Sequence, residues 1–395
     1  MDAAQTMLSK RILSIDILRG LVMIIMALDH TRDFFHIGAM TGDPLNPDTT
    51  TVMLFFTRWI THFCAPAFVF LSGLSAYLSA QGKTPGQVST FLFKRGLWLI
   101  FVELTVITFG LTFNPGYNFI ILQVIWAIGT SMIFLAIFSR LSHKVVLIAG
   151  LLLVFGHNLF NLFPAPKDPA TGMFLKVFFT ASGTVLPLSA NHFAGVFYAI
   201  LPWTGVMFVG YGVGAWYRRG YNAERRRRNL LMVGFLTVFI FVALRLINIY
   251  GDPFPRKEYG DLLKNLLSFF NVNKYPPSLQ YISMTLGPAM LFLAITENIS
   301  NWFTKVTSVY GAVPFFYYVL HFYLLHILLI AVFFATGQST KEIVQIPFMF
   351  RPATFGFNLP LVYLIWLAVV ASLYLPCRWF KRYKETHRQW WLRYV

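Results

Sequence analysis

The first apolar segment of the chain, residues 13–35, carries residue types that could do acid–base chemistry inside a membrane. Arg19 and His30 are 11 residues apart in it. On an α-helix this separation is a rise of about 16.5 Å, and it leaves the two side chains roughly 20° from the same face. Asp29 precedes His30 directly, and Asp33 follows it by nearly one turn. A histidine beside a carboxylate can take a proton from an amine or hydroxyl, or can accept an acyl group itself.

The composition indicates an integral membrane protein. The chain has 395 residues, of which 57% are hydrophobic and 12% charged, whereas soluble domains carry about 25% charged residues. Apolar runs long enough to cross a bilayer recur along the whole length. The first run is too long for the apolar core of a signal peptide, so we expect no cleavable signal. The predicted fold class is all-α.

The apolar runs predict about ten transmembrane helices. The predicted spans are residues 13–35, 52–80, 89–113, 117–138, 144–163, 193–217, 229–250, 277–297, 308–335 and 358–380. Pro66 is expected to kink or break the second span, because proline lacks the backbone N–H that a helix needs. No linker divides the chain, so residues 1–395 are predicted to form a single domain.

The basic residues predict the topology. The formal net charge is +17, and the Lys and Arg residues concentrate at both termini and in alternate loops, including the run Arg225–Arg228. This bias is typical of cytoplasmic loops. It predicts a multi-pass protein of the plasma membrane, the inner membrane in a bacterium, with both termini in the cytoplasm. The charge is therefore not interpreted as a nucleic-acid-binding surface.

Several predicted spans carry polar or ionisable side chains. An ionisable residue inside the bilayer costs roughly 2.5 kcal/mol or more, so it normally faces the protein interior or a cavity. One structural explanation for these buried charges is an internal ion pair, in which Glu103 or an aspartate binds Arg58 or Arg245. We expect this explanation to hold for Glu103 and Arg245. The residues expected to line a cavity are Arg58, His62, Gln123, Tyr317 and His321.

Other chemistries lack their sequence signatures. A catalytic metal needs three or four converging ligands, and the chain has no His-Glu-x-x-His pattern, so no metal is expected. A serine hydrolase would need a Gly-x-Ser-x-Gly elbow, which is absent. Cys64 and Cys377 fall in different predicted spans, which argues against a disulfide or a thiolate site. No strands are expected, and therefore no nucleotide-binding strand–turn–helix unit.

Several motifs together resemble the transmembrane acyltransferase superfamily. They are Arg11-x-x-Ser-x-Asp16-x-x-Arg19-Gly, Asp29-His30, Ala67-Phe-Val-Phe-Leu-Ser-Gly73 and Pro314-Phe-Phe-Tyr-Tyr-Val-Leu-His321. The superfamily includes the acyltransferase-3 proteins and the heparan-α-glucosaminide N-acetyltransferase-like proteins. Within the second branch, the chain is most similar to the bacterial DUF1624 group, which has counterparts of Gln123–Ser131, Pro202–Met207 and Tyr275–Leu279. The resemblance extends over most of the chain.

This resemblance implies transfer of an acyl group, most simply acetyl, from cytoplasmic acyl-CoA to a sugar or glycoconjugate on the outer side of the membrane. His30 matches the acyltransferase-3 histidine that is held to be catalytic, and Arg19 matches the arginine that binds the donor's phosphates. The rise of about 16 Å between them is of the order of an extended pantetheine chain. Arg11, Lys94 and Arg95 are further candidates for binding the phosphates.

The remaining roles are hypotheses. Asp29 or Asp33 would orient His30, and His62 is the second candidate for the catalytic histidine. Arg58, Gln123 or Tyr317 would supply donors to the oxyanion of the tetrahedral intermediate. Direct transfer and an acyl-histidine intermediate both remain open, as do N- and O-acylation. A homodimer is compatible with the aromatic-rich spans.

Two other functions explain part of the pattern. A transporter or flippase for a polar metabolite would also need intramembrane charges, but it leaves the spacing of Arg19 and His30 without a role. A purely structural membrane protein would tolerate apolar replacements of the buried charges. Binding of acyl-CoA favours the enzyme, whereas substrate flux into vesicles without CoA favours the transporter.

Overall fold

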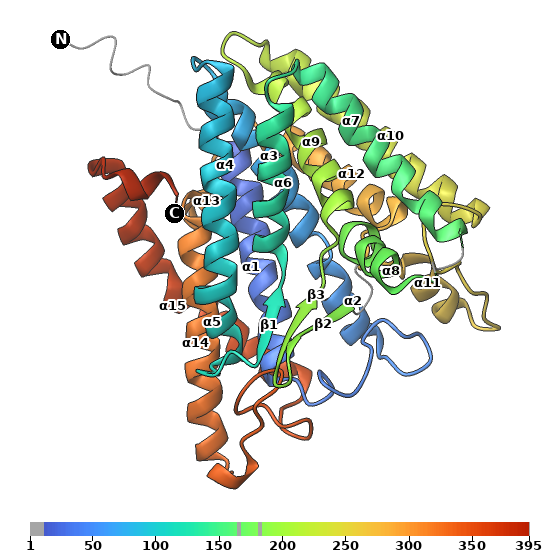
Figure 1. Cartoon of the computed structure of the whole chain (residues 1–395), viewed down its shortest axis with the longest axis vertical. Coiled ribbons are helices and arrows are strands. Elements are labelled where there is room, and N and C mark those ends of the chain that lie inside the picture. Colours follow the sequence, from blue (N-terminus) through green and yellow to red (C-terminus); the bar gives the residue numbers. More distant parts are fainter. Residues whose placement is uncertain (1–11, 164–166, 181–183, 395) are drawn as a thin grey trace.

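The computed structural model describes residues 12–163, 167–180 and 184–394. Arg11 therefore lies outside the described residues. The described chain is mostly helical, and its long helices run side by side (Figure 1). The helices are α1 (Leu13–Phe35), α2 (Val52–Thr61), α3 (Cys64–Ala80), α4 (Pro85–Val102), α5 (Thr108–Thr112), α6 (Val124–Phe138), α7 (His143–Gly156), α8 (Pro169–Leu175), α9 (Ile200–Gly214), α10 (Ala223–Ile247), α11 (Leu262–Phe270), α12 (Leu279–Thr296), α13 (Trp302–Ala312), α14 (Pro314–Ala335) and α15 (Leu359–Thr386).

The expectation of an all-helical chain without strands was wrong in one region. Strands β1 (Phe119–Leu122), β2 (Thr184–Ser189) and β3 (His192–Val196) form a small sheet in the order β1-β3-β2. β1 is parallel to β3, and β2 is antiparallel to it. β1 and most of β3 lie inside the predicted spans 117–138 and 193–217. Short apolar runs do not distinguish a strand from a buried helix, which is why both were assigned to helices.

Six helical segments within the described residues are long and apolar enough to cross a membrane. They are Val52–Ala80, His143–Leu162, Ala223–Ile247, Leu279–Thr296, Pro314–Ala335 and Leu359–Thr386. Their length and composition identify a helical membrane protein. The total of about ten spans stays a prediction. The predicted span 308–335 is in fact two helices, α13 and α14, because α14 begins at Pro314, whose ring nitrogen cannot continue a helix.

The second predicted span is broken as expected from Pro66. α2 ends at Thr61 and α3 begins at Cys64, so the break precedes the proline by one turn. Pro66 has no N–H to offer the carbonyl of His62, four residues earlier. The hydroxyl of Tyr281 donates to this carbonyl instead, at 2.8 Å. The break is thereby satisfied by a hydrogen bond from α12, and it brings α2 and α12 together.

Helix α1 occupies the middle of the fold and packs against α3, α13, α14 and α15. Its contact with α13 is the closest, since a Cβ added at Gly20 would lie 1.8 Å from the carbonyl oxygen of Thr307. A Cβ at Gly311 would lie 1.9 Å from the carbonyl oxygen of Asp16. The two backbones therefore touch, and neither position has room for a side chain. This contact places Arg19 against the end of α13.

The longer connecting segments gather at the end of the molecule to which the C-terminal part of α1 points, together with the sheet, α2, α8 and α11 (Figure 1). The segment after α14 is tied to α1 by Arg351, which donates to the carbonyls of Asp33 and His36 at 3.4 and 2.6 Å. Phe348 stacks on Phe34 at 5.2 Å. These contacts fix the end of α1 that carries the candidate catalytic residues.

Candidate active site

A pair of histidines lies where α1 meets α14. Nδ1 of His30 is 2.7 Å from Nε2 of His321, and the ring of His30 also stacks on Phe322 at 4.4 Å. His321 is fully buried. α14 starts at Pro314, so His321 comes two turns into this helix, whereas His30 lies in the second turn from the C-terminal end of α1. The side chain in hydrogen-bond contact with His30 is therefore a second imidazole.

The neighbours of the pair determine which nitrogen carries each proton when both rings are neutral. Nδ1 of His321 lies 3.3 Å from the carbonyl oxygen of Tyr317. A carbonyl can only accept, so this nitrogen donates, and Nε2 of His321 is left as an acceptor. Nδ1 of His30 then donates to it. Nε2 of His30 keeps its lone pair, which is the state that a general base requires.

The two aspartates near His30 bind arginines. Arg32 donates to Asp29 at 3.1 Å and to Asp33 at 2.6 Å, and Arg58 of α2 pairs with the other oxygen of Asp29. An ion pair between an aspartate and Arg58, one of the structural explanations considered for the buried charges, is thus present. The sequence predicted that Asp29 or Asp33 would orient His30. Among the described residues, neither carboxylate is hydrogen-bonded to His30. Because these charges are buried, each needs its partner to offset the cost of leaving water.

A small pocket opens beside the imidazole of His30, and we call it the His30 pocket. Its cavity volume is about 30 Å³, enough for a water molecule. The side chains that line it include Asp29, His30, Cys64, Phe68, Gln123, Val124, Tyr198 and Lys274. Gln123 is therefore at the site as predicted from the sequence, between β1 and α6.

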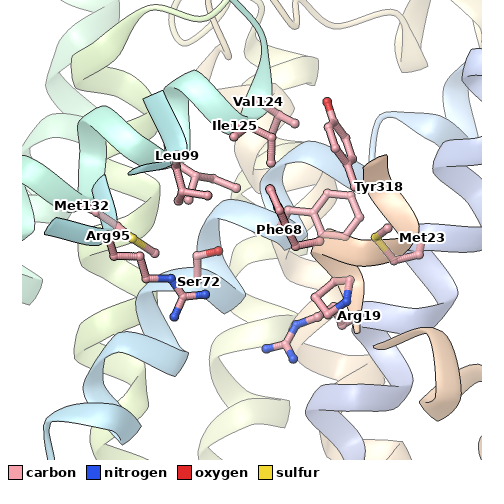
Figure 2. A pocket seen from close by; sticks show the side chains of 13 residues that line it. Arg19, Met23, Phe68, Ser72, Arg95, Leu99, Val124, Ile125, Met132 and Tyr318 are labelled. Atoms are coloured by element: carbon pink, nitrogen blue, oxygen red, sulfur yellow. The ribbon is translucent and has the colours of Figure 1, made fainter. Parts of the chain in front are cut away.

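A second cavity of about 90 Å³ adjoins the first, and we call it the arginine pocket. Phe68 and Val124 line both cavities and form the partition between them. Arg19 and Arg95 extend toward one end of the arginine pocket, whereas Val124 and Ile125 lie at the opposite end (Figure 2). Two guanidinium groups at one end and an apolar middle suit a ligand with an anionic head and an extended chain.

Two larger cavities open at either end of these pockets. The mouth, about 540 Å³, is lined by Asp16, Arg19 and Arg219 at the N-terminal end of α1. The vestibule, about 600 Å³, is lined by Arg32 and Lys274 beyond the C-terminal end of α1. Arg19 lines both the mouth and the arginine pocket, and Lys274 lines both the vestibule and the His30 pocket. The four cavities therefore follow one another along α1, with their narrowest part at His30.

The structure separates the two basic residues predicted on α4. Arg95 lines the arginine pocket, and its Nε has no hydrogen-bond partner within the described part of the chain. Lys94 is exposed on the outer face of the helix and lines none of the four cavities. Neighbouring positions on a helix are about 100° apart, so only one of the two can face the pocket.

The other predicted site residues take distinct places. Arg58 and His62 line the vestibule, and Nδ1 of His62 lies 2.9 Å from the carbonyl oxygen of Arg58. Tyr317 is fully buried and lines none of the four cavities. His321 lies behind His30, away from the cavities. No cluster of His, Cys, Asp or Glu that could hold a metal occurs among the residues that the structure describes.

Glu103 and Arg245 do not form the ion pairs expected of them within the described chain. Glu103 lies in a π-helical turn, and its carboxylate accepts the backbone N–H of Gln123 at 2.6 Å, which caps the N-terminus of α6. A carboxylate is favourable there because helix N-termini are partly positive. Arg245 donates to the backbone carbonyls of Ser268, Phe269 and Asn271. Both are buried structural groups.

Lys274, which belongs to the loop before α12, was not predicted from the sequence as a site residue. Carboxylate Oδ2 of Asp252 accepts hydrogen bonds from the N–H of Asn273 at 2.9 Å and the hydroxyl of Ser278 at 2.8 Å, and so holds this loop. Burial raises the pKa of Asp252 above its usual value, against the lowering effect of these hydrogen bonds. The signal in the sequence was the position of this lysine directly before the Tyr275–Leu279 motif.

These features define a class of protein, namely a helical membrane protein in which a hydrogen-bonded histidine pair lies between two open cavities at opposite ends of its central helix. The chain belongs to the heparan-α-glucosaminide N-acetyltransferase family, since the family model described as "Heparan-alpha-glucosaminide N-acetyltransferase, catalytic" matches residues 11–250. None of the curated proteins compared with the chain matches it. Membership of this family supports a function of the acetyltransferase type in a membrane. His321 and Lys274 lie beyond the matched residues, so their interpretation depends on geometry.

Proposed function

We propose that the protein transfers an acyl group, most simply acetyl, from acyl-CoA in the cytoplasm to an amine or hydroxyl of a sugar or glycoconjugate on the outer side. The observation that carries this proposal is the series of four cavities along α1. It has arginines at one end, a histidine base in the narrow middle and a polar vestibule at the other end. A donor and an acceptor could therefore reach His30 from opposite sides.

The donor would enter through the mouth. Arg19 and Arg95 would bind its phosphates, and the pantetheine arm would extend along the apolar part of the arginine pocket toward His30. The distance of about 16.5 Å between residues 19 and 30 along α1 suits such an arm. The basic run Arg225–Arg228 supports a cytoplasmic position for this end of the molecule. The acceptor would enter through the vestibule on the other side.

The proposed chemistry is direct transfer. Nε2 of His30 takes a proton from the acceptor as its nitrogen or oxygen attacks the thioester carbonyl, and a tetrahedral intermediate forms. This intermediate then breaks its C–S bond, and the imidazolium returns the proton to the leaving sulfur, which gives CoA with a free thiol. His321 would hold His30 in the tautomer that this step needs, a role that the sequence had suggested for Asp29 or Asp33. Separate entries for the two substrates favour this route over an acyl-histidine intermediate.

The first test is binding of acetyl-CoA to the purified protein in detergent, measured by calorimetry. Replacement of Arg19 or Arg95 by alanine should weaken binding roughly 10- to 100-fold, because each removes a charge-assisted hydrogen bond of about 1.5–3 kcal/mol. Lys94→Ala is the matched control, since this exposed neighbour of Arg95 should leave the affinity unchanged. Absence of acetyl-CoA binding to the wild type would refute the donor half of the proposal.

His321→Leu should lower kcat roughly 10- to 100-fold, because His30 loses a hydrogen bond worth about 1.5–3 kcal/mol in its charged state. KM for acetyl-CoA should stay unchanged, since His321 lines neither the mouth nor the arginine pocket. His321→Gln should recover part of the rate, because its amide oxygen can accept from Nδ1 of His30. Equal rates for the leucine and glutamine variants would contradict the orienting role.

A transport function would use the same path and remains the second candidate. Its support is that cavities reach both ends of α1. It gives no role to the hydrogen-bonded histidine pair, and the cavity at His30 holds only about 30 Å³. Uptake of a labelled amino sugar into vesicles without CoA would favour transport, whereas acetylation that requires acetyl-CoA favours the enzyme.

A further inference from the structure

Lys274 lies at the junction between the vestibule and the His30 pocket, and it lines both. It is only 9% exposed. Its Nζ lies 5.1 Å from the centre of the Tyr275 ring. The loop that carries it is held by Asp252, as described above, so its backbone is fixed on both sides of the residue. A buried lysine ammonium is therefore held beside the candidate general base.

Among the residues that the structure describes, no carboxylate forms an ion pair with Lys274. The two arginines near His30 are paired, Arg32 with Asp29 and Asp33, and Arg58 with Asp29. Lys274 forms no ion pair within the described residues. This group of three cations and two carboxylates thus has one excess positive charge next to the His30 pocket. In a water-poor site, such a charge strongly favours a negative charge that forms within reach.

We infer that Lys274 is a catalytic residue that stabilises the oxyanion of the tetrahedral intermediate. The inference rests on the proposed acyl transfer at His30. When the acceptor attacks, the electron pair of the thioester C=O bond moves onto its oxygen, and it returns when the C–S bond breaks. Lys274 stays protonated throughout, while His30 carries the transferred proton. The oxyanion therefore neutralises the excess positive charge of the site, and it does so only while it exists. This interaction lowers the free energy of the transition state but not that of the bound substrate, so it speeds the reaction.

The three oxyanion donors expected from the sequence fit this role less well. Arg58 is already paired with Asp29, and its charge is offset in the resting site. Tyr317 is fully buried and lines neither the His30 pocket nor the vestibule. Gln123 lines the His30 pocket and can supply a second, neutral hydrogen bond. The ammonium of Lys274 is the cation that lines this pocket.

The inference is tested by hydrolysis of acetyl-CoA by the full-length protein, with water as acceptor, because this reaction forms the same oxyanion without a sugar. Released CoA is measured by chromatography. Lys274→Met should lower kcat roughly 100- to 1,000-fold, the usual effect of removing one oxyanion donor, and leave KM for acetyl-CoA nearly unchanged. Lys274→Arg should restore part of the rate. Lys341→Met, which removes an exposed lysine that lines none of the four cavities, is the matched control and should have no effect.

A binding experiment separates this inference from the proposed function. Acetonyl-CoA is a stable ketone analogue of the donor, and trifluoroacetonyl-CoA forms a hydrate that mimics the tetrahedral intermediate. The wild type should bind the fluorinated ketone more tightly, and Lys274→Met or Lys274→Gln should abolish the preference while still binding acetonyl-CoA, which also shows that the variants are folded. An unchanged preference, or an unchanged kcat, would overturn the role of Lys274 alone. Failure of the wild type to bind either ketone would refute the proposed donor site as well.

Discussion

Replacement of His30 by alanine is expected to lower kcat for acetyl transfer to glucosamine by about 1,000-fold, within the range seen when a general base is removed. The physical reason is that His30 lines the small pocket between the two proposed substrate entries, and that its hydrogen bond to His321 through Nδ1 leaves Nε2 with a free lone pair. The affinity for acetyl-CoA should change little, because the phosphates would bind about 16.5 Å away. Kinetics and calorimetry on the same detergent preparation measure both quantities.

His62→Ala is the control for this experiment. His62 lies in the vestibule with its Nδ1 at hydrogen-bond distance from the carbonyl of Arg58, and it belongs to the break between α2 and α3. Its replacement should raise KM for the acceptor more than it lowers kcat. If His62→Ala abolishes turnover and His30→Ala does not, the catalytic role belongs to His62, the second candidate from the sequence.

Replacement of Gly20 by alanine is expected to destabilise the whole fold by about 3 kcal/mol or more, at the upper end of the usual cost of overpacking. A Cβ at this position would lie 1.8 Å from the carbonyl oxygen of Thr307, and backbone cannot move away as a flexible side chain could. α1 and α13 would have to separate. Arg19 would then lose its 3.2 Å hydrogen bond to the carbonyl of Gly311, so acetyl-CoA binding should weaken together with stability.

Thermal unfolding in detergent, followed by the intrinsic fluorescence of the tryptophans, measures this effect. Gly86→Ala is the matched control, because its Cβ would meet no atom within 4 Å at the start of α4. The control should leave the melting temperature unchanged or raise it slightly, since alanine favours a helix more than glycine does. Similar melting temperatures for the two variants would show that α1 and α13 do not touch at this point.

Much of the candidate site was predictable because it lies on one helix. Arg19, Asp29, His30 and Asp33 all belong to α1, and helix geometry alone predicts their relative heights and faces. Gln123 and Arg95 were also found, the first beside His30 and the second in the arginine pocket. Their assignment to the site followed from motifs and charge within predicted spans.

The partners of these residues were harder to predict. Glu103 was expected to pair with an arginine, but it caps α6, because a helix N-terminus offers backbone donors that no residue pattern displays. Lys94 and Arg95 were equivalent in the sequence, and the rotation of α4 against α6 decides which of them faces the pocket. The strands β1 and β3 were hidden inside apolar runs for a similar reason, since pairing between distant segments creates a strand that local composition does not reveal.

The sequence by itself determined the membrane class, the helical character and the spacing of Arg19 and His30, because these depend on composition and on the geometry of a single helix. Only the tertiary structure decided that His30 bonds to His321, 291 residues away along the chain. Only the tertiary structure also decided that the aspartates near His30 form ion pairs with arginines and that Lys274 lines the His30 pocket. Such contacts depend on how the helices pack and on where the loops lie in the folded chain, and neither can be predicted from local sequence.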